Sequence, residues 1–209
     1  TAAAQGNTGE WVIDPTNIEI ITGSDDGSSV WNASQIKAGT IQVALASTNV
    51  TVTTVSSGTT DAGNIKVSAP IVWTADNDLR LNAENNILLN ATIDASGGSG
   101  GLELYYGQST SNGGDSTYSI NAPINLSSSG SFVTRKGTSG SPINHTIITT
   151  LGDVGSTTGT DLQGMSVDLD GNYVLGLNVN ASETSSWSDD AGFDPIGDAD
   201  NQFLGSFDG

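Results

Sequence analysis

Residues 63–98 read GNIKVSAPIVWTADNDLRLNAENNILLNATIDASGG, and their pattern decides the fold. Apolar and polar residues alternate in short runs, and clusters of Gly, Asn, Ser and Asp separate the runs. Such alternation predicts brief β-strands with one buried face. The stretch therefore indicates a protein of many short strands rather than a helical one.

A four-residue pattern within this stretch recurs along the chain, as SAPI at 68–71, NATI at 90–93 and NAPI at 121–124. The copies are 22 and 31 residues apart, and each follows an alternating run. A shared local pattern with unequal spacing is typical of solenoid rungs, whose connecting loops vary in length. The last residue of each copy is an isoleucine, and these three isoleucines are expected to point into one core from parallel strands: Ile71, Ile93 and Ile124.

Two all-β architectures fit this pattern, a parallel β-helix and a β-sandwich. A sandwich calls for tight Asn-Gly or Asp-Gly hairpin turns, and these dipeptides are scarce in the chain. We therefore predict an all-β parallel β-helix, with the β-sandwich as the alternative. Further strands are predicted at residues 41–45 (IQVAL), 49–54, 79–83, 102–106 and 173–179.

The composition supports a thin β core. Of the 209 residues, more than half are Ser, Thr, Asn, Asp or Gly, and 35% are hydrophobic. Five Lys and Arg stand against 23 Asp and Glu, for a net charge of −18. No basic cluster is present to neutralise phosphates, so nucleic acid is not an expected partner. The sequence contains no apolar run long enough to predict a membrane-spanning helix. The absence of Cys excludes disulfides and thiol catalysis.

The charge divides the sequence into two regions. Residues 1–150 carry twelve acids and all five bases, whereas residues 151–209 carry eleven acids and no base. We interpret the first region as β-helix rungs. The second is interpreted as an acidic, loop-rich continuation.

Two segments resemble a known family. GEWVIDPTNIEI at 9–20 and the stretch at 63–98 resemble the haemagglutinin-like repeat region of filamentous haemagglutinin-type adhesins, and the similarity covers about residues 9–150. The resemblance implies a right-handed parallel β-helix and attachment to cells or surfaces. It also implies secretion to the bacterial surface by the two-partner route, with an outer-membrane secretion partner for the parent chain. The expected binding partner is a host or surface receptor, of which carbohydrate is one class.

Residues 161–209 resemble a module of large bacterial surface proteins, through GFDPIG at 192–197 and FLGSFDG at 203–209. In that family the chain continues into another rung, so this sequence is expected to be a fragment. The last seventeen residues are rich in large apolar side chains and are expected to fold as a loop against the last rung. The residues concerned are Phe193, Ile196, Phe203, Leu204 and Phe207.

Oxygen-bearing side chains suggest two calcium sites. DLDGN begins like a calcium loop with Asp168, Asp170 and Asn172, but Val179 occupies the position where an acid should close it. A turn between two strands is the simpler interpretation. The second candidate comprises Asp189, Asp190, Asp194, Asp198 and Asp200, and for these residues solvated loop acids are the favoured interpretation. No other cofactor is expected.

Catalysis is not predicted, although β-helices host polysaccharide hydrolases and lyases. Asp76 with Asp78, and Asp189 with Asp190, are the candidate carboxylate pairs, and neither spacing shows the separation that a glycosidase needs. The single histidine, His145, lies in INHTII and is expected on an exposed strand face.

Aromatic residues offer one further site. Rings can stack on sugars, so a carbohydrate platform is one hypothesis, whereas aromatic rings in a β-helix more often fill the core or cover the end of a rung. The residues concerned are Tyr105, Tyr106 and Tyr118, with Trp31 and Trp73.

Taken together, the pattern and the resemblance lead us to expect a non-enzymatic adhesin segment for structural reach and display. The alternative is a carbohydrate-active β-helix enzyme or a sugar-binding module.

Overall fold

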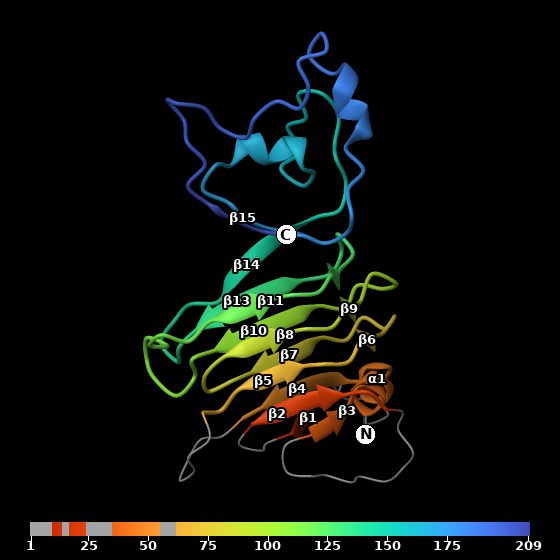
Figure 1. The fold of residues 1–209 in the computed structure, drawn as a ribbon, viewed down its shortest axis with the longest axis vertical. Coiled ribbons are helices and arrows are strands. Elements are labelled where there is room, and N and C mark those ends of the chain that lie inside the picture. Colours follow the sequence, from red (N-terminus) through yellow and green to blue (C-terminus); the bar gives the residue numbers. More distant parts are fainter. Residues whose placement is uncertain (1–9, 14–16, 24–34, 55–61) are drawn as a thin grey trace, which may run out of the picture.

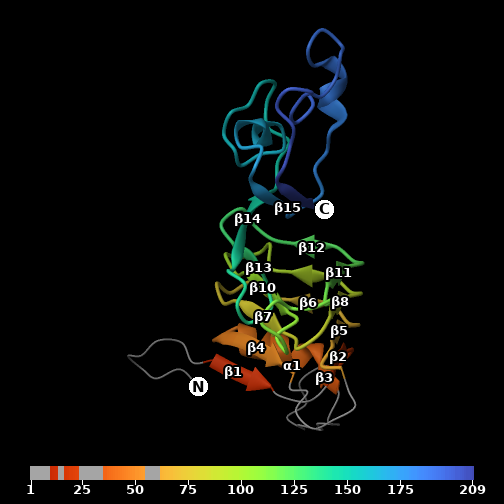
Figure 2. The ribbon, with the colours of Figure 1, turned by 90° about the vertical axis from the view of Figure 1, so that its left-hand side faces the viewer.

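The computed structural model describes residues 10–13, 17–23, 35–54 and 62–209. Short strands lie one above another along the long axis, and a loop-rich module stands at one end of the stack (Figure 1). Seen from the side, the strands group into separate sheets (Figure 2). The molecule is therefore mostly β, and its arrangement is consistent with a β-solenoid.

Thirteen of the described strands form the stack in three sheets, and every pairing between two of these thirteen strands is parallel. The first sheet contains, in spatial order, β1 (Glu10–Ile13), β4 (Asn49–Thr53), β7 (Leu79–Asn82), β10 (Leu102–Tyr106) and β13 (Phe132–Lys136). The second contains β3 (Gln35–Lys37), β2 (Ile18–Ile21), β5 (Ile65–Val67), β8 (Ile87–Leu89) and β11 (Tyr118–Ile120). The third contains β6 (Ile71–Val72), β9 (Ile93–Asp94) and β12 (Ile124–Asn125).

The chain visits the three sheets in turn. β4, β5 and β6 form one rung, β7, β8 and β9 the next, and β10, β11 and β12 the third. Within these three rungs, each strand therefore pairs with strands of other rungs and not with the other strands of its own rung. This parallel stacking disagrees with a sandwich of antiparallel hairpins.

The prediction that the three isoleucines of the repeated pattern point into one core from parallel strands is confirmed. Ile71 pairs with Ile93, and Ile93 pairs with Ile124, so the spacings of 22 and 31 residues each correspond to one rung. All three side chains are buried. In the first sheet Leu79, Leu102 and Phe132 stack in the same way and are at most 1% exposed. Burial of each such side chain contributes about 1.5–3 kcal/mol.

Asparagines at the bends join one rung to the next. The Asn17 side-chain oxygen accepts the backbone N–H of Asn64 at 2.8 Å, and the Asn64 oxygen accepts that of Asn86 at 3.0 Å. The Asn86 oxygen then accepts the N–H of Thr117 at 2.8 Å. Each Asn precedes an inward Ile, so the repeated Asn-Ile dipeptide specifies both a bend and a core position.

The strand predicted at residues 41–45 is wrong, because these residues lie in helix α1 (Ala38–Leu45). Ala38, Ile41 and Leu45 recur at helical spacing and are all buried. The helix contacts β6, and the Gln42 Oε1 accepts the Val72 N–H at 3.0 Å. α1 thus covers the first edge of the third sheet.

Chain direction changes after the last rung. β14 (Ile143–Ile148) pairs antiparallel with β13, and its second half pairs parallel with β15 (Asn172–Leu175). β16 (Ser206–Asp208) then pairs parallel with β15. Between these strands lie two 3₁₀ helices, η1 (Gln163–Val167) and η2 (Ser182–Ser186). We call residues 151–209 the acidic module. The division of the chain at residues 150 and 151 remains a prediction.

The last seventeen residues do not fold as one apolar loop against the last rung. Ile196 and Phe203 pack instead on a small cluster within the module, and Phe193 stacks on Trp187. Leu204 and Phe207 are 74% and 43% exposed. The prediction failed because β16 pairs with β15 and extends the sheet, so the end of this segment continues the strand order and does not cover it as a loop.

Candidate functional site

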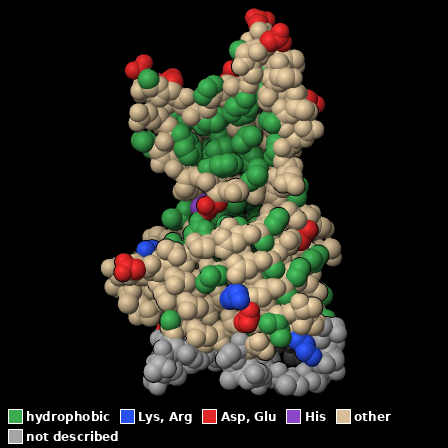
Figure 3. All heavy atoms as spheres, in the orientation of Figure 1, with side chains coloured by type: hydrophobic (Ala, Val, Ile, Leu, Met, Phe, Trp, Pro, Cys, Tyr) green, Lys and Arg blue, Asp and Glu red, His purple; other side chains and the backbone are tan. Residues whose placement is uncertain are grey.

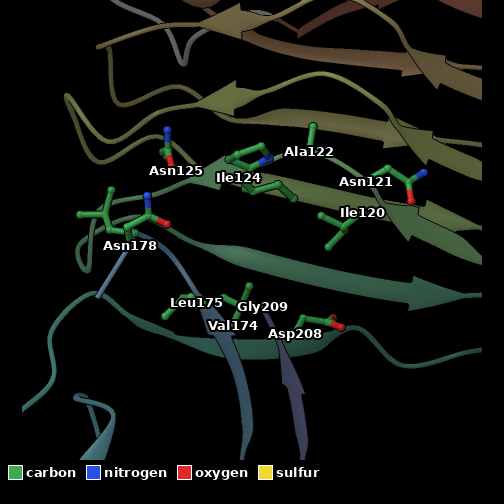
Figure 4. Close-up of a pocket in the computed structure, with 12 residues that line it drawn as sticks. Ile120, Asn121, Ala122, Ile124, Asn125, Val174, Leu175, Asn178, Asp208 and Gly209 are labelled. Carbon is green, nitrogen blue, oxygen red and sulfur yellow. The ribbon is translucent and has the colours of Figure 1, made fainter. Parts of the chain in front are cut away.

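A pocket of about 360 Å³ lies between the third rung and the acidic module, and we call it the junction pocket (Figure 4). Ile120 and Ile124 line it from the stack, and Val174, Leu175 and Leu177 line it from the module. Its polar lining consists of Asn121, Asn125, Asn178 and Asp208. This volume is sufficient for a small ligand.

The pocket exists because two sheets end beneath the module. In the described part of the chain, β11 and β12 are the last strands of their sheets. The segment after β15 crosses over β12, and the Leu126 N–H donates to the Gly176 carbonyl oxygen at 2.8 Å. A side chain at Gly176 would place its Cβ 2.4 Å from Ile147 and 2.7 Å from the Leu126 oxygen, so glycine permits the close approach. The space beside this crossing is not filled by side chains and forms the junction pocket.

Asp208, which lines the pocket, takes part in a tyrosine–carboxylate contact. The Tyr118 hydroxyl donates a short hydrogen bond to the Asp208 Oδ2, which ties β11 to β16. Tyr106 packs edge-on against Tyr118, with ring centroids 5.2 Å apart. Burial raises the pKa of Tyr118, and the bond to Asp208 raises it further. The hydroxyl therefore stays protonated and acts as a donor.

His145 lies near this contact, and its predicted exposure is wrong. It is only 9% exposed, and one ring nitrogen, Nε2, lies 3.0 Å from the Thr134 hydroxyl. The imidazole packs edge-on against Phe132 at 5.1 Å, because the antiparallel pairing of β13 and β14 places these two residues opposite each other. Burial lowers the pKa of His145, while the negative charge of Asp208 partly offsets this effect. The ring is therefore neutral at pH 7.

The three predicted platform tyrosines do not form one surface. Tyr106 and Tyr118 are in contact, whereas Tyr105 lies on the opposite face of β10. There the guanidinium carbons of Arg80 and Arg135 lie 4.9 and 5.5 Å from the Tyr105 ring centroid. Carbohydrate binding by these tyrosines remains a prediction.

The two tryptophans in that prediction have different outcomes. Trp73 is 4% exposed and donates to the Asn77 carbonyl oxygen at 2.8 Å, so it fills the core and fastens a bend. Trp31 lies outside the described residues.

The calcium candidates are spread over several loops. Across the described ranges, no group of three or more His, Cys, Asp or Glu side chains is arranged to hold a metal ion. Asp194 accepts a hydrogen bond from the Ser188 hydroxyl at 2.9 Å, and Asp198 accepts the backbone N–H groups of Asp200 and Asn201. Asp189 has a left-handed backbone with φ of 57°. The structure therefore does not assemble the five acids into one site, and calcium binding remains a prediction.

The DLDGN segment forms a turn before a strand. Asp168 accepts the backbone N–H of Asp170 at 3.3 Å, and Asn172 belongs to β15, where its side chain accepts the Ser206 hydroxyl at 2.8 Å. Asp168 and Asp170 line one side of a shallow surface groove of about 760 Å³, and Asp198 lines it as well.

The candidate carboxylate pair of the stack has a structural role. Asp76 accepts the Ser99 N–H at 2.9 Å, and Asp78 accepts the Gly101 N–H at 2.7 Å. Both carboxylates thus bond the next rung at its bend. The second pair, Asp189 and Asp190, lies in an exposed loop of the acidic module.

Sequence reasoning did not find the junction pocket. NAPI at 121–124 predicts part of a rung, but nothing in the local sequence shows that β12 is the last described strand of its sheet. Comparison of the chain with protein-family models, curated proteins and solved structures found no match. Within the described residues, none of the helices is long and apolar enough to cross a membrane.

Proposed function

We propose that this chain is a non-enzymatic segment of a secreted bacterial surface adhesin, built as a right-handed parallel β-helix for reach and display. The observation that carries the proposal is the stack of parallel rungs with matched core positions and bends bonded from rung to rung. An architecture of this kind grows by repetition and needs neither metals nor disulfides. It suits a protein that must extend away from a cell.

The outer surface supports the same role. Outward positions on the strands are mostly polar or charged, as at Thr53, Asn82 and Glu103, and the chain carries a net charge of −18. A strong charge of one sign keeps proteins soluble and discourages association along their sides. This property favours an extended display element over a subunit that packs laterally.

The resemblance of residues 9–150 to filamentous haemagglutinin-type adhesins supplies the biological setting of the proposal. In that setting the parent chain leaves the cell through an outer-membrane secretion partner and attaches to a host or surface receptor. Carbohydrate is one receptor class. None of the described residues that line the junction pocket is aromatic, so these residues offer a sugar no stacking surface there.

Surface labelling tests the proposal. Antibodies raised against the folded chain are applied to intact cells that carry the gene and to cells permeabilised beforehand. We expect equal labelling of both, and loss of the signal after brief protease treatment of intact cells. Labelling that requires permeabilisation contradicts a surface adhesin. A crystal structure in which the rungs coil to the left contradicts the proposed handedness.

A further inference from the structure

The acidic module contains an open apolar hollow. Figure 3 shows hydrophobic side chains lining the space between two arms of the module, with acidic side chains at the outer ends of the arms. The core of the module is a small buried cluster of Ile148, Met165 and Tyr173. Four side chains that pack against this cluster are only partly buried: Leu162, Leu175, Ile196 and Phe203. We call the partly open surface that these four side chains form the hollow.

The apolar exposure is concentrated in this module. Inward side chains of the stack, such as Leu81 and Leu104, are 0% exposed. Of the seven large hydrophobic side chains that are exposed in the described part of the chain, four belong to residues 151–209: Val154, Val167, Leu204 and Phe207. A concentration of exposed apolar surface rimmed by polar residues marks an interaction surface.

Charge specifies what can cover the hollow. Residues 151–209 contain eleven acids and no base. Asp189 and Asp190 are exposed in the segment after η2, which forms one arm, and Asp198 and Asp200 are exposed in the segment before β16, which forms the other (Figure 1). Backbone N–H groups of Asp200 and Asn201 lower the pKa of Asp198, which keeps it ionised. A partner therefore enters a strongly negative field.

A second copy of this chain is a poor occupant, because two modules with this charge would repel each other when their hollows meet. A purely cationic segment would leave the apolar surface wet, and a purely apolar one would leave the acids unpaired. The surface thus favours a partner that presents both apolar and basic side chains.

We propose that the hollow of the acidic module binds a segment of another protein in which aliphatic or aromatic side chains are interspersed with Lys or Arg. The apolar side chains cover Leu162, Leu175, Ile196 and Phe203, and the basic side chains face the acids of the two arms. This inference does not depend on the adhesin assignment, since it rests on the surface of residues 151–209 alone.

Peptide binding to the full chain tests the proposal. The probe is a fluorescein-labelled synthetic peptide of alternating Leu and Lys, followed by fluorescence anisotropy at low salt. Two matched peptides replace every Leu by Ser, or every Lys by Glu. We expect only the Leu-Lys peptide to bind, and its affinity to fall about tenfold or more when NaCl is raised from about 50 to about 500 mM.

Paired variants locate the binding surface. Asp200→Asn removes an exposed charge from one arm, and Asp115→Asn removes an exposed charge from the stack as its control. Ile196→Thr reduces the apolar hollow, and Val72→Thr alters a side chain of the stack that is 49% exposed. Both module variants should weaken binding about threefold or more, whereas the two stack variants should not change it. Unchanged circular dichroism and melting show that each variant is folded.

Three results would overturn the proposal. Equal binding of the Leu-Lys and Ser-Lys peptides would show attraction to charge alone. Equal effects of the module and stack variants would show that the peptide does not use the hollow. Dimers in light scattering that disappear in Ile196→Thr but not in Val72→Thr would show that a second copy covers it. None of these results bears on the surface labelling of intact cells.

Discussion

Asn64 illustrates how a single residue type serves the whole stack. Its side-chain oxygen accepts the Asn86 N–H, while its own N–H donates to the Asn17 side chain. Replacement by Ala leaves the Asn86 N–H without this acceptor in a half-buried bend, so Asn64→Ala should lower the free energy of unfolding by about 1–2 kcal/mol. Asn144→Ala, at an exposed position of β14, should change it by less than about 0.5 kcal/mol in the same urea titration. Equal losses in the two variants would contradict a special role for the bend.

Ile93 tests the core at the same scale. It is fully buried between Ile71 and Ile124, so Ile93→Asp places a carboxylate in an apolar core without a partner. We expect a loss of about 4 kcal/mol in the free energy of unfolding. Val72 lies one strand position after Ile71 and is 49% exposed, so Val72→Asp is the control and should cost less than about 1 kcal/mol. Chemical denaturation measures both variants, and a mild effect of Ile93→Asp would contradict the inward assignment.

His145 makes stability depend on pH. Its pKa is lowered in the folded state by burial, so the unfolded chain, with a pKa of about 6.5, binds the proton more readily. The free energy of unfolding should therefore fall as pH drops from about 7.5 to about 5.5, a range above the titration of the carboxylates. His145→Gln should flatten this dependence in urea titrations across the range. A slope that the variant retains would assign the effect to other groups.

At the scale of elements, the alternation of apolar and polar residues predicts much of the stack, but it does not predict that the strand direction reverses at β14. SAPI, NATI and NAPI are each a local pattern, and their common environment follows from sequence because every rung repeats it. β14 carries a similar alternation, but its inward face depends on antiparallel pairing with β13, which is a non-local property. The error at His145 has this origin. IQVAL at 41–45 predicts a strand but forms a helix, because a short apolar run fits the period of a strand and the period of a helix equally well.

β16 and the loop before it protect the end of the sheet. β16 pairs with β15, while Ile196 and Phe203 pack on the module cluster of Met165 and Tyr173. Deletion of residues 192–209 should therefore expose an unpaired strand edge together with apolar surface. We expect oligomers in light scattering at concentrations where the full chain is monomeric, together with a lower melting temperature. A truncated chain that is monomeric and equally stable would show that this segment contributes nothing to the fold.

At the scale of the whole molecule, two kinds of construction meet at the junction pocket. The stack buries nearly all of its inward side chains, whereas the acidic module leaves much of its apolar surface partly open and carries eleven acids. Composition indicated the shift in charge near residue 151 but not the hollow or the pocket. The hollow and the pocket both depend on the packing of segments that are far apart in the sequence. At the pocket, for example, the segment at Gly176 crosses the chain at Leu126.

The same unbalanced charge makes calcium the natural ligand to test on the whole chain. A calcium site needs six to eight oxygens around one ion, and the candidate acids already bond their own loops, as Asp198 does with two backbone N–H groups. Millimolar calcium should therefore change the melting temperature by less than about 1 °C relative to magnesium at equal concentration, because both ions then only screen charge. Differential scanning calorimetry with a chelator as baseline measures this difference. A rise of several degrees with calcium alone, lost in Asp194→Asn but retained in Asp115→Asn, would instead establish a specific site on the arms of the acidic module.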